Sequence, residues 1–432
     1  MDTLPAEILI EIFNLCTTDP AEPLVPLNLS CVSTWWREVV QSSPRIWQYI
    51  HLDDRSTLAF SRAQVALWTR RSYPLSFDIT LDVAQSSNLI LPLLSPLLPF
   101  MDRWRHFTMT GLRQESVVLS GSLADGIDPL IISLQDPDQA AKGSLRRTFA
   151  GMAPEWLAMN IWVSELPQPL TLLPMHFTAV VMSEHSLSIH TQPRSILEFL
   201  SMCPQLVAFS FAGWHHDDEE RMNAPPLPVV RLPELRKLHL RTTCGTRSLL
   251  SCIDAPGLTE LYLASLNVDF QLALPIEEDG DSDDEAGDFS RSPGSDRATG
   301  MGLRRLLLRS NPPLRVLHMD WSDMRTKDFR FAFDHLSSLE WFFISASDMS
   351  DRVIELLRPF SSVRLPMLRR LELINCNELS GEVILQVLSA RVAVTDTLSE
   401  LAIIQCEGFT EQHAALLRKD FRGTLETSRE AM

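Results

Sequence analysis

A recurring arrangement of apolar residues, L-x-x-L-x-L, constrains the fold of this chain more than any other feature. Complete copies begin at Leu235, Leu258 and Leu368. Looser copies, in which other apolar residues replace some leucines, begin at Trp47, Pro74, Trp104, Ile127, Trp156, Phe177, Leu206, Leu314, Leu339 and Leu398. The copies start 21 to 30 residues apart, except for one gap of 56 residues after Leu258. Such a period indicates a stack of repeats rather than separate globular domains.

Each copy predicts a short strand and a return segment. The last two apolar residues alternate and therefore point to the same side of a strand. Several return segments carry helical apolar spacing, such as Val353, Leu356 and Leu357. The period lies in the range of leucine-rich repeats. We therefore expect an α/β fold in which an irregular leucine-rich-repeat solenoid spans residues 51–426, with a curved parallel sheet on its concave side and helices and loops on its convex side.

Composition and charge exclude several classes of protein. Hydrophobic residues make up 45% of the 432 residues, enough for a core and too many for a disordered chain. The net charge of −17 argues against a nucleic-acid partner, since the phosphate backbone requires a dense basic face. No apolar run is long enough to span a membrane. The acidic N-terminus and seven cysteines without C-x-x-C predict an intracellular protein of the cytoplasm and/or nucleus.

Residues 277–300, within the long gap, are predicted to be a disordered acidic insertion. They hold nine acidic residues, two arginines and one phenylalanine, for a net charge of −7, so little surface can be buried to offset ordering. Ser282 precedes three acids and Ser292 precedes a proline, which makes both candidate phosphorylation sites. The alternative is a solvated tether with no regulatory role.

The first 50 residues carry three short helical patterns with more large apolar side chains than they can bury alone. Residues 4–16 place apolar groups at positions 4, 8, 12 and 15, and Pro5 suits a first helical turn. Pro26 stands where a second helix would begin, which predicts that this helix is short. The apolar surplus predicts a protein partner. The alternative is a helical cap that seals the first repeat.

The residues of this segment resemble an F-box of the fungal-type F-box and leucine-rich-repeat family. The resemblance is carried by Leu4-Pro5-x-Glu7-Ile8, Ile12-Phe13, Leu29-x-x-Val32-x-x-x-Trp36-Arg37 and Ser43-Pro44-x-Ile46-Trp47. It implies a three-helix F-box over residues 1–50 that binds a Skp-family adaptor, and a substrate receptor of an SCF-type cullin–RING ubiquitin ligase. The adaptor-binding residues implied are Leu4, Pro5, Ile8, Ile12, Phe13, Leu29, Val32 and Trp36.

Aromatic residues at the third and fifth positions of several copies predict a substrate-binding patch. These positions flank the buried leucines and face away from the core. Interfaces favour aromatic and arginine anchors. The predicted patch consists of Tyr262, His318, Trp341, Phe343 and Arg370. Lys237 and Arg241 on the same face, together with Arg370, suggest an acidic or phosphorylated protein substrate. The alternative is that the C-terminal tail covers these aromatics as ordinary core.

No catalytic or cofactor motif is present, so we expect no enzyme, no cofactor and no metal. The chain lacks phosphate-binding glycine loops, H-E-x-x-H and G-x-S-x-G. The acidic run 215–220 is consecutive and would point its side chains in different directions. Cys376 and Cys406 end two strands and are expected to be buried thiols. The sequence thus favours a non-catalytic substrate adaptor; the alternatives are a leucine-rich-repeat scaffold and an F-box protein acting outside a ubiquitin ligase.

Overall fold

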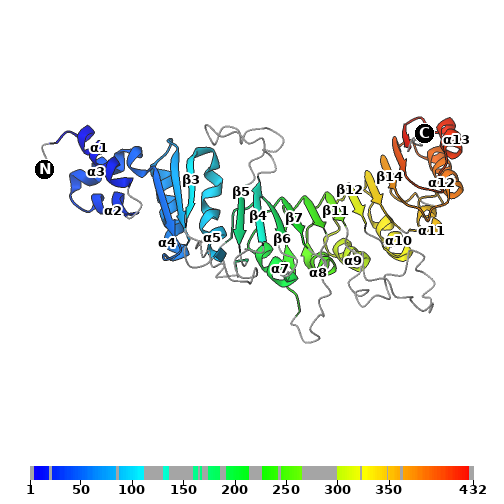
Figure 1. Cartoon of the computed structure of the whole chain (residues 1–432), viewed down its shortest axis with the longest axis horizontal. Coiled ribbons are helices and arrows are strands. Elements are labelled where there is room, and N and C mark those ends of the chain that lie inside the picture. The colour runs from blue at the N-terminus through cyan, green and yellow to red at the C-terminus, as the bar shows by residue number, and fades with distance from the viewer. Residues whose placement is uncertain are drawn as a thin grey trace, which may run out of the picture. The chain divides into compact units, whose positions relative to one another are not determined.

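The computed structural model describes residues 4–18, 22–83, 87–110, 130–135, 159–163, 166–167, 174–184, 191–213, 226–241, 245–264, 299–321, 324–347, 349–360 and 363–427. The chain is mixed α/β and divides into two compact units, Met1–Val180 and Val181–Met432 (Figure 1). No helix in these ranges is long and apolar enough to cross a lipid bilayer.

The N-terminal unit begins with three short helices, α1 (Ala6–Thr17), α2 (Val25–Ser30) and α3 (Thr34–Ser42), followed by the 3-10 turn η1 (Pro44–Trp47). The prediction of a short second helix is confirmed, because α2 has only six residues and Pro26 lies in its first turn. The Ser33 hydroxyl caps α3 by accepting a 3.1 Å hydrogen bond from the Trp36 amide. Both α2 and α3 pack against α1.

A three-stranded parallel sheet follows, built from β1 (Tyr49–Asp53), β2 (Phe77–Asp82) and β3 (Trp104–Thr110). The connections contain α4 (Leu58–Arg71), η2 (Ser87–Leu89), α5 (Ile90–Leu94) and η3 (Ser95–Arg103). The same unit contains β4 (Leu130–Gln135) and β5 (Met159–Val163), which pair antiparallel. The expectation of parallel strands throughout residues 51–426 is therefore wrong at β4 and β5. Apolar alternation is the same in both strand directions, so the pattern could not specify the direction.

The C-terminal unit contains a sheet whose strands lie in chain order. The strands are β6 (Ala179–Glu184), β7 (Ala208–Ala212), β9 (Lys237–Arg241), β11 (Glu260–Ala264), β12 (Val316–Asp320), β13 (Trp341–Ser345), β14 (Arg370–Ile374), β15 (Glu400–Ile404) and β16 (Thr424–Thr427). From β7 to β16 every neighbouring pair is parallel. Each strand of this sheet except β16 begins two residues after the first apolar residue of a sequence copy, so these predicted strands are confirmed.

Helices connect these strands and contact one another in chain order. They are α7 (Pro193–Ser201), α8 (Thr246–Cys252), α9 (Thr299–Ser310), α10 (Thr326–His335), α11 (Asp351–Glu355), α12 (Gly381–Val394) and α13 (Glu411–Asp420). Figure 1 shows α7 to α11 along one side of the sheet. A two-residue parallel pair, β8 (Val230–Arg231) with β10 (Ile253–Asp254), accompanies them. The side chains that alternate with the buried leucines lie on the opposite face of the sheet.

The backbone repeats the same hydrogen bonds from one strand to the next. Two successive N–H groups at the start of β12, those of Arg315 and Val316, donate to the Thr259 carbonyl at 2.8 and 3.0 Å. The same paired arrangement precedes β9, β11, β13, β14 and β15. The residues that follow β12 to β15 also share a left-handed backbone, with φ between 50° and 54°: Trp321, Ala346, Asn375 and Gln405. This regularity makes each strand with its connection one structural unit.

The long gap in the sequence contains one such unit rather than two. β11 pairs directly with β12, placing Tyr262 opposite His318, and α9 lies between α8 and α10. Residues 277–298 of the predicted insertion, with Ser282 and Ser292, lie outside the described residues. Thr299 and Gly300, which we assigned to the insertion, instead form the start of α9 and are buried. A glycine packed against Asp328 explains this, since a Cβ at Gly300 would lie 2.5 Å from the Asp328 carboxylate.

Candidate partner-binding surfaces

The first helix of the chain exposes a row of large apolar side chains. Leu4, Ile8, Ile12 and Leu15 are 40%, 49%, 44% and 72% exposed. The spacing of four and three residues places Ile8, Ile12 and Leu15 on one side of α1, and Leu4 lies two residues before the first residue of the helix. The opposite side carries Leu9 and Phe13 into the core. We call the row Leu4, Ile8, Ile12 and Leu15 the α1 face.

Other predicted adaptor-binding residues differ in exposure. Pro5 and Val32 are exposed, whereas Leu29 and Trp36 are half-buried. Phe13 is only 1% exposed, and its ring packs against Trp36 with centroids 4.8 Å apart. Phe13 therefore packs inside the free chain, because α1 turns this position towards α3, and its assignment to adaptor binding stays a prediction. Leu15 and Trp35 are exposed and were not predicted, although Leu15 continues the helical spacing of Ile8 and Ile12.

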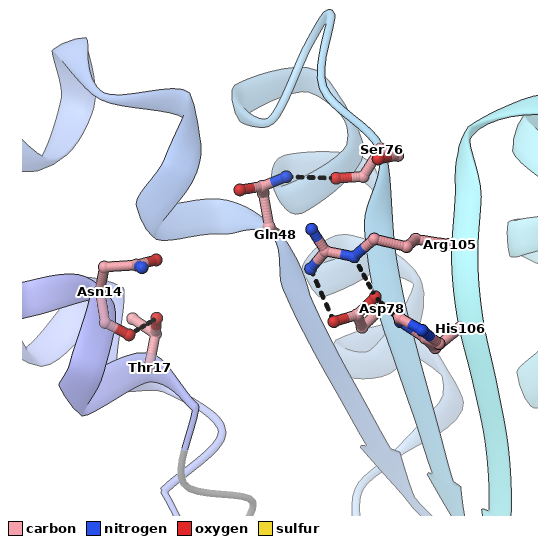
Figure 2. Close-up of polar contacts among 7 residues, drawn as sticks. All are labelled: Asn14, Thr17, Gln48, Ser76, Asp78, Arg105 and His106. Atoms are coloured by element: carbon pink, nitrogen blue, oxygen red, sulfur yellow. Dashed lines mark hydrogen bonds and ion pairs between the residues drawn. The ribbon is translucent and has the colours of Figure 1, made fainter. Parts of the chain in front are cut away.

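A polar cluster joins β2 to β3 in the N-terminal unit (Figure 2). The Arg105 guanidinium donates to both oxygens of Asp78, at 2.8 and 2.7 Å, and His106 Nδ1 lies 2.9 Å from Asp78 Oδ1. Burial alone would raise the pKa of Asp78, but the hydrogen bonds from Arg105 and His106 outweigh it and hold the pKa below its usual value. Nearby, Gln48 donates to the Ser76 carbonyl at 2.6 Å. These contacts hold the strands together and offer no nucleophile.

A ladder of rings crosses four strands of the C-terminal sheet. His239, Tyr262, His318 and Phe343 occupy the same register position on β9, β11, β12 and β13. Successive ring centroids lie 5.8, 5.6 and 3.7 Å apart, and the last pair is nearly parallel at 13°. All four side chains are half-buried. The predicted residues Tyr262, His318 and Phe343 thus come together, and His239, which was not predicted, extends the ladder.

Trp341 and Arg370 stand beside this ladder on neighbouring strands. The two residues are register partners on β13 and β14, and the Arg370 guanidinium carbon lies 4.7 Å from the Trp341 ring centroid. The Trp341 indole nitrogen is buried and has no hydrogen-bond partner. We call His239, Tyr262, His318, Trp341, Phe343 and Arg370 the aromatic face. The described C-terminal residues form β16 at the edge of the sheet and do not cover it.

Two of the three cations predicted on this face, Arg370 and Lys237, are paired with carboxylates. Arg370 donates to Glu372 at 2.6 Å and lies 3.3 Å from Glu400. Lys237 lies 3.1 Å from Glu260. The interpretation that these two cations are available for an acidic substrate is therefore not supported. An incoming acid would compete with glutamates held on the same or the adjacent strand.

Burial keeps the titratable rings of the aromatic face uncharged near neutral pH. Desolvation lowers the pKa values of His239 and His318 below the ordinary 6.5. Burial, followed by the charge of Glu260, raises the pKa of Tyr262 to about 12. The Tyr262 hydroxyl donates to Glu260 at 3.0 Å. These rings therefore carry no charge near neutral pH.

The two strand-terminal cysteines have the buried position expected of them. Cys376 and Cys406 are 0% and 6% exposed, and their thiols contact backbone carbonyls of their own and the preceding strand. A hydrogen bond with Cys376 lowers the pKa of Cys406 against the opposing effect of burial. Across the part of the chain that the structure describes, no group of three or more His, Cys, Asp or Glu side chains is arranged to hold a metal. The acidic run 215–220 lies outside those residues.

Comparison with known proteins adds no family. No family model matches the chain. No curated protein matches it either.

Proposed function

We propose that this chain is a non-catalytic substrate adaptor of an SCF-type cullin–RING ubiquitin ligase in the cytoplasm or nucleus. In this proposal residues 1–50 form an F-box that binds a Skp-family adaptor protein. The strand–helix units form a leucine-rich-repeat solenoid that holds a protein substrate. The α1 face is the observation that carries the proposal, because four large apolar side chains at the start of the chain are 40% to 72% exposed among the residues that the structure describes.

The aromatic face supports the second half of the proposal. Its rings lie on the sheet face opposite the helices, away from the buried leucines. Aromatic side chains with a neighbouring arginine are typical anchors of protein interfaces. Because its one arginine, Arg370, is paired with glutamates and its histidines are neutral, the substrate surface we propose is apolar or aromatic rather than acidic.

Co-purification tests the adaptor half of the proposal. The wild-type chain is co-expressed with a Skp-family adaptor and a cullin, and both are expected to be retained. The variant Ile8→Asp with Ile12→Asp is expected to lose both, because two carboxylates would be desolvated in the interface. Leu416→Asp, at a helix position of similar exposure in α13, is the matched control and should retain both.

The outcomes separate the candidate functions. Absence of the adaptor from the wild type, or its retention by the double variant, would contradict the proposal. Retention of the adaptor without the cullin would indicate an F-box protein that works outside a ubiquitin ligase. For the substrate half, the variant Trp341→Ala with Phe343→Ala should abolish substrate capture by an adaptor-bound complex; unchanged capture by a stable variant would contradict the assignment of this face.

A further inference from the structure

The N-terminal unit contains an open cleft of about 720 Å³ between α4, η3 and residues 174–177. Apolar groups dominate its walls, and its described lining contains four basic residues and no acidic ones. The lining residues are Arg62, Val65, Ala66, Thr69, Arg70, Tyr73, Pro96, Pro99, Phe100, Arg103 and His176. A cavity of several hundred Å³ with apolar walls and a few polar groups is typical of sites for small molecules.

Arg62 brings an incompletely paired guanidinium to this cleft. Its Nη2 donates to the Pro174 carbonyl at 3.0 Å, but its buried Nε has no hydrogen-bond partner. Desolvation lowers the pKa of Arg62, so its charge is held at a cost that an anion would relieve. Arg70, two turns further along α4, adds a second, exposed charge to the same cleft.

Arg103 places a third positive charge against neutral partners. Its guanidinium donates to the carbonyls of Thr69 and Leu75 and to the Ser72 hydroxyl, at 2.7 to 3.1 Å. It also lies 5.5 Å from the ring centroid of Tyr73. Burial lowers the pKa of Arg103, and the nearby charge of Asp102 opposes this effect. The hydrogen bonds hold the cation in place without neutralising it.

We propose that this cleft binds a small amphipathic carboxylate, with its apolar body against Val65, Pro96 and Phe100 and its carboxylate towards Arg62 and Arg70. A free inorganic anion would leave the apolar walls uncovered. A neutral apolar molecule would leave the positive charges of Arg62 and Arg70 without a counter-ion in a described lining that has no acidic residue. A molecule with both parts satisfies both, and a carboxylate can accept two hydrogen bonds from a guanidinium.

Isothermal titration of the full chain with decanoate tests the proposal, with 1-decanol as the uncharged probe. Decanoate is expected to bind once per chain and at least about 10-fold more tightly than 1-decanol, because hydrogen bonds to charged groups are the stronger ones. The affinity for decanoate should fall as salt is raised. No saturable binding of decanoate, or equal affinity for the two probes, would overturn the proposal.

Three variants locate the site. Arg62→Gln with Arg70→Gln should weaken decanoate binding about 10-fold or more while leaving 1-decanol binding unchanged. Ala66→Trp, on the exposed side of α4, should abolish binding of both probes by filling the cleft. Arg55→Gln with Arg422→Gln, which removes the same two positive charges at exposed positions outside the lining, is the matched control and should bind like the wild type. Tight binding by Ala66→Trp would overturn the proposal.

The outcome of the decanoate titration does not depend on the ligase proposal. The α1 face is also apolar, so the variant Ile8→Asp with Ile12→Asp is titrated in parallel. It should bind decanoate like the wild type, and loss of binding in this variant would assign the probe to α1 and overturn the cleft. Co-purification of the adaptor involves none of the cleft residues, so either proposal can fail alone.

Discussion

The α1 face and the aromatic face both present apolar side chains, but they differ in how those side chains are supported. On α1 each residue stands separately, with 40% to 72% of its surface exposed. On the sheet the rings contact one another across strands and are half-buried by these contacts. The aromatic face therefore contributes to the stability of its own unit, whereas the α1 face contributes little. Substitutions should separate binding from stability on α1 and combine them on the sheet.

The largest effect is expected for Phe13, which belongs to the same helix as the α1 face but points inward. Phe13→Ala removes a buried ring that packs on Trp36 and should lower the free energy of unfolding by about 3–5 kcal/mol. Ile8→Ala on the exposed side should change it by less than about 0.5 kcal/mol. Urea unfolding of both variants checks the difference. Equal losses would mean that the α1 face is core.

A smaller effect is expected from the closest ring pair of the aromatic face. His318 and Phe343 stack with centroids 3.7 Å apart. A double-mutant cycle with His318→Ala and Phe343→Ala should show a coupling of about 0.5–1.5 kcal/mol in unfolding free energy. The cycle Ile8→Ala with Leu15→Ala is the control from α1, where we expect no coupling. A coupling near zero between His318 and Phe343 would mean that their stacking does not contribute to the unfolding free energy.

The two faces differ equally in how far the sequence could predict them. Strand positions were predictable because two alternating leucines recur at a fixed place in each unit, and β9, β11 and β14 begin where the complete copies require. The burial of Phe13 was not predictable, because residues 4–16 place apolar side chains on several sides of the helix. The pattern does not specify which side packs against α3. The direction of β5 was also invisible, since alternation carries no direction.

The ion pairs of Arg370 with neighbouring glutamates were predictable in principle, but we did not predict them. Arg370 and Glu372 stand two residues apart on one strand, which puts them on one face. Glu400 lies opposite Arg370 once the register of β14 and β15 is known. The arginine cleft between α4 and η3 had no sequence signal, because its residues come from three separate segments whose contact depends on the packing of the N-terminal unit.

Lowering the pH should destabilise the aromatic face, which carries two histidines, by less than the substitutions described above. The α1 face carries no titratable side chain. The folded pKa values of His239 and His318 lie below the ordinary 6.5, so the unfolded chain binds protons first as the pH falls. The C-terminal unit should therefore lose stability progressively below about pH 6.5 and show no such change above it. Melting temperatures between pH 5 and 8 check this, and His239→Gln with His318→Gln should flatten the profile. A profile unchanged in that variant would assign the loss to other groups.

The smallest effect on stability is expected where the effect on partner binding is largest. Ile8→Asp with Ile12→Asp places two carboxylates on the exposed side of α1 and should leave the unfolding free energy within about 0.5 kcal/mol per site, because neither side chain is enclosed by the chain. The measurement is urea unfolding of the isolated chain, compared with Leu416→Asp. A large loss of stability would mean that the α1 face packs within the protein, and the adaptor result could then follow from unfolding rather than from the interface. Unchanged stability with lost adaptor binding would separate the two explanations, since the loss of binding could then not follow from unfolding of the free chain.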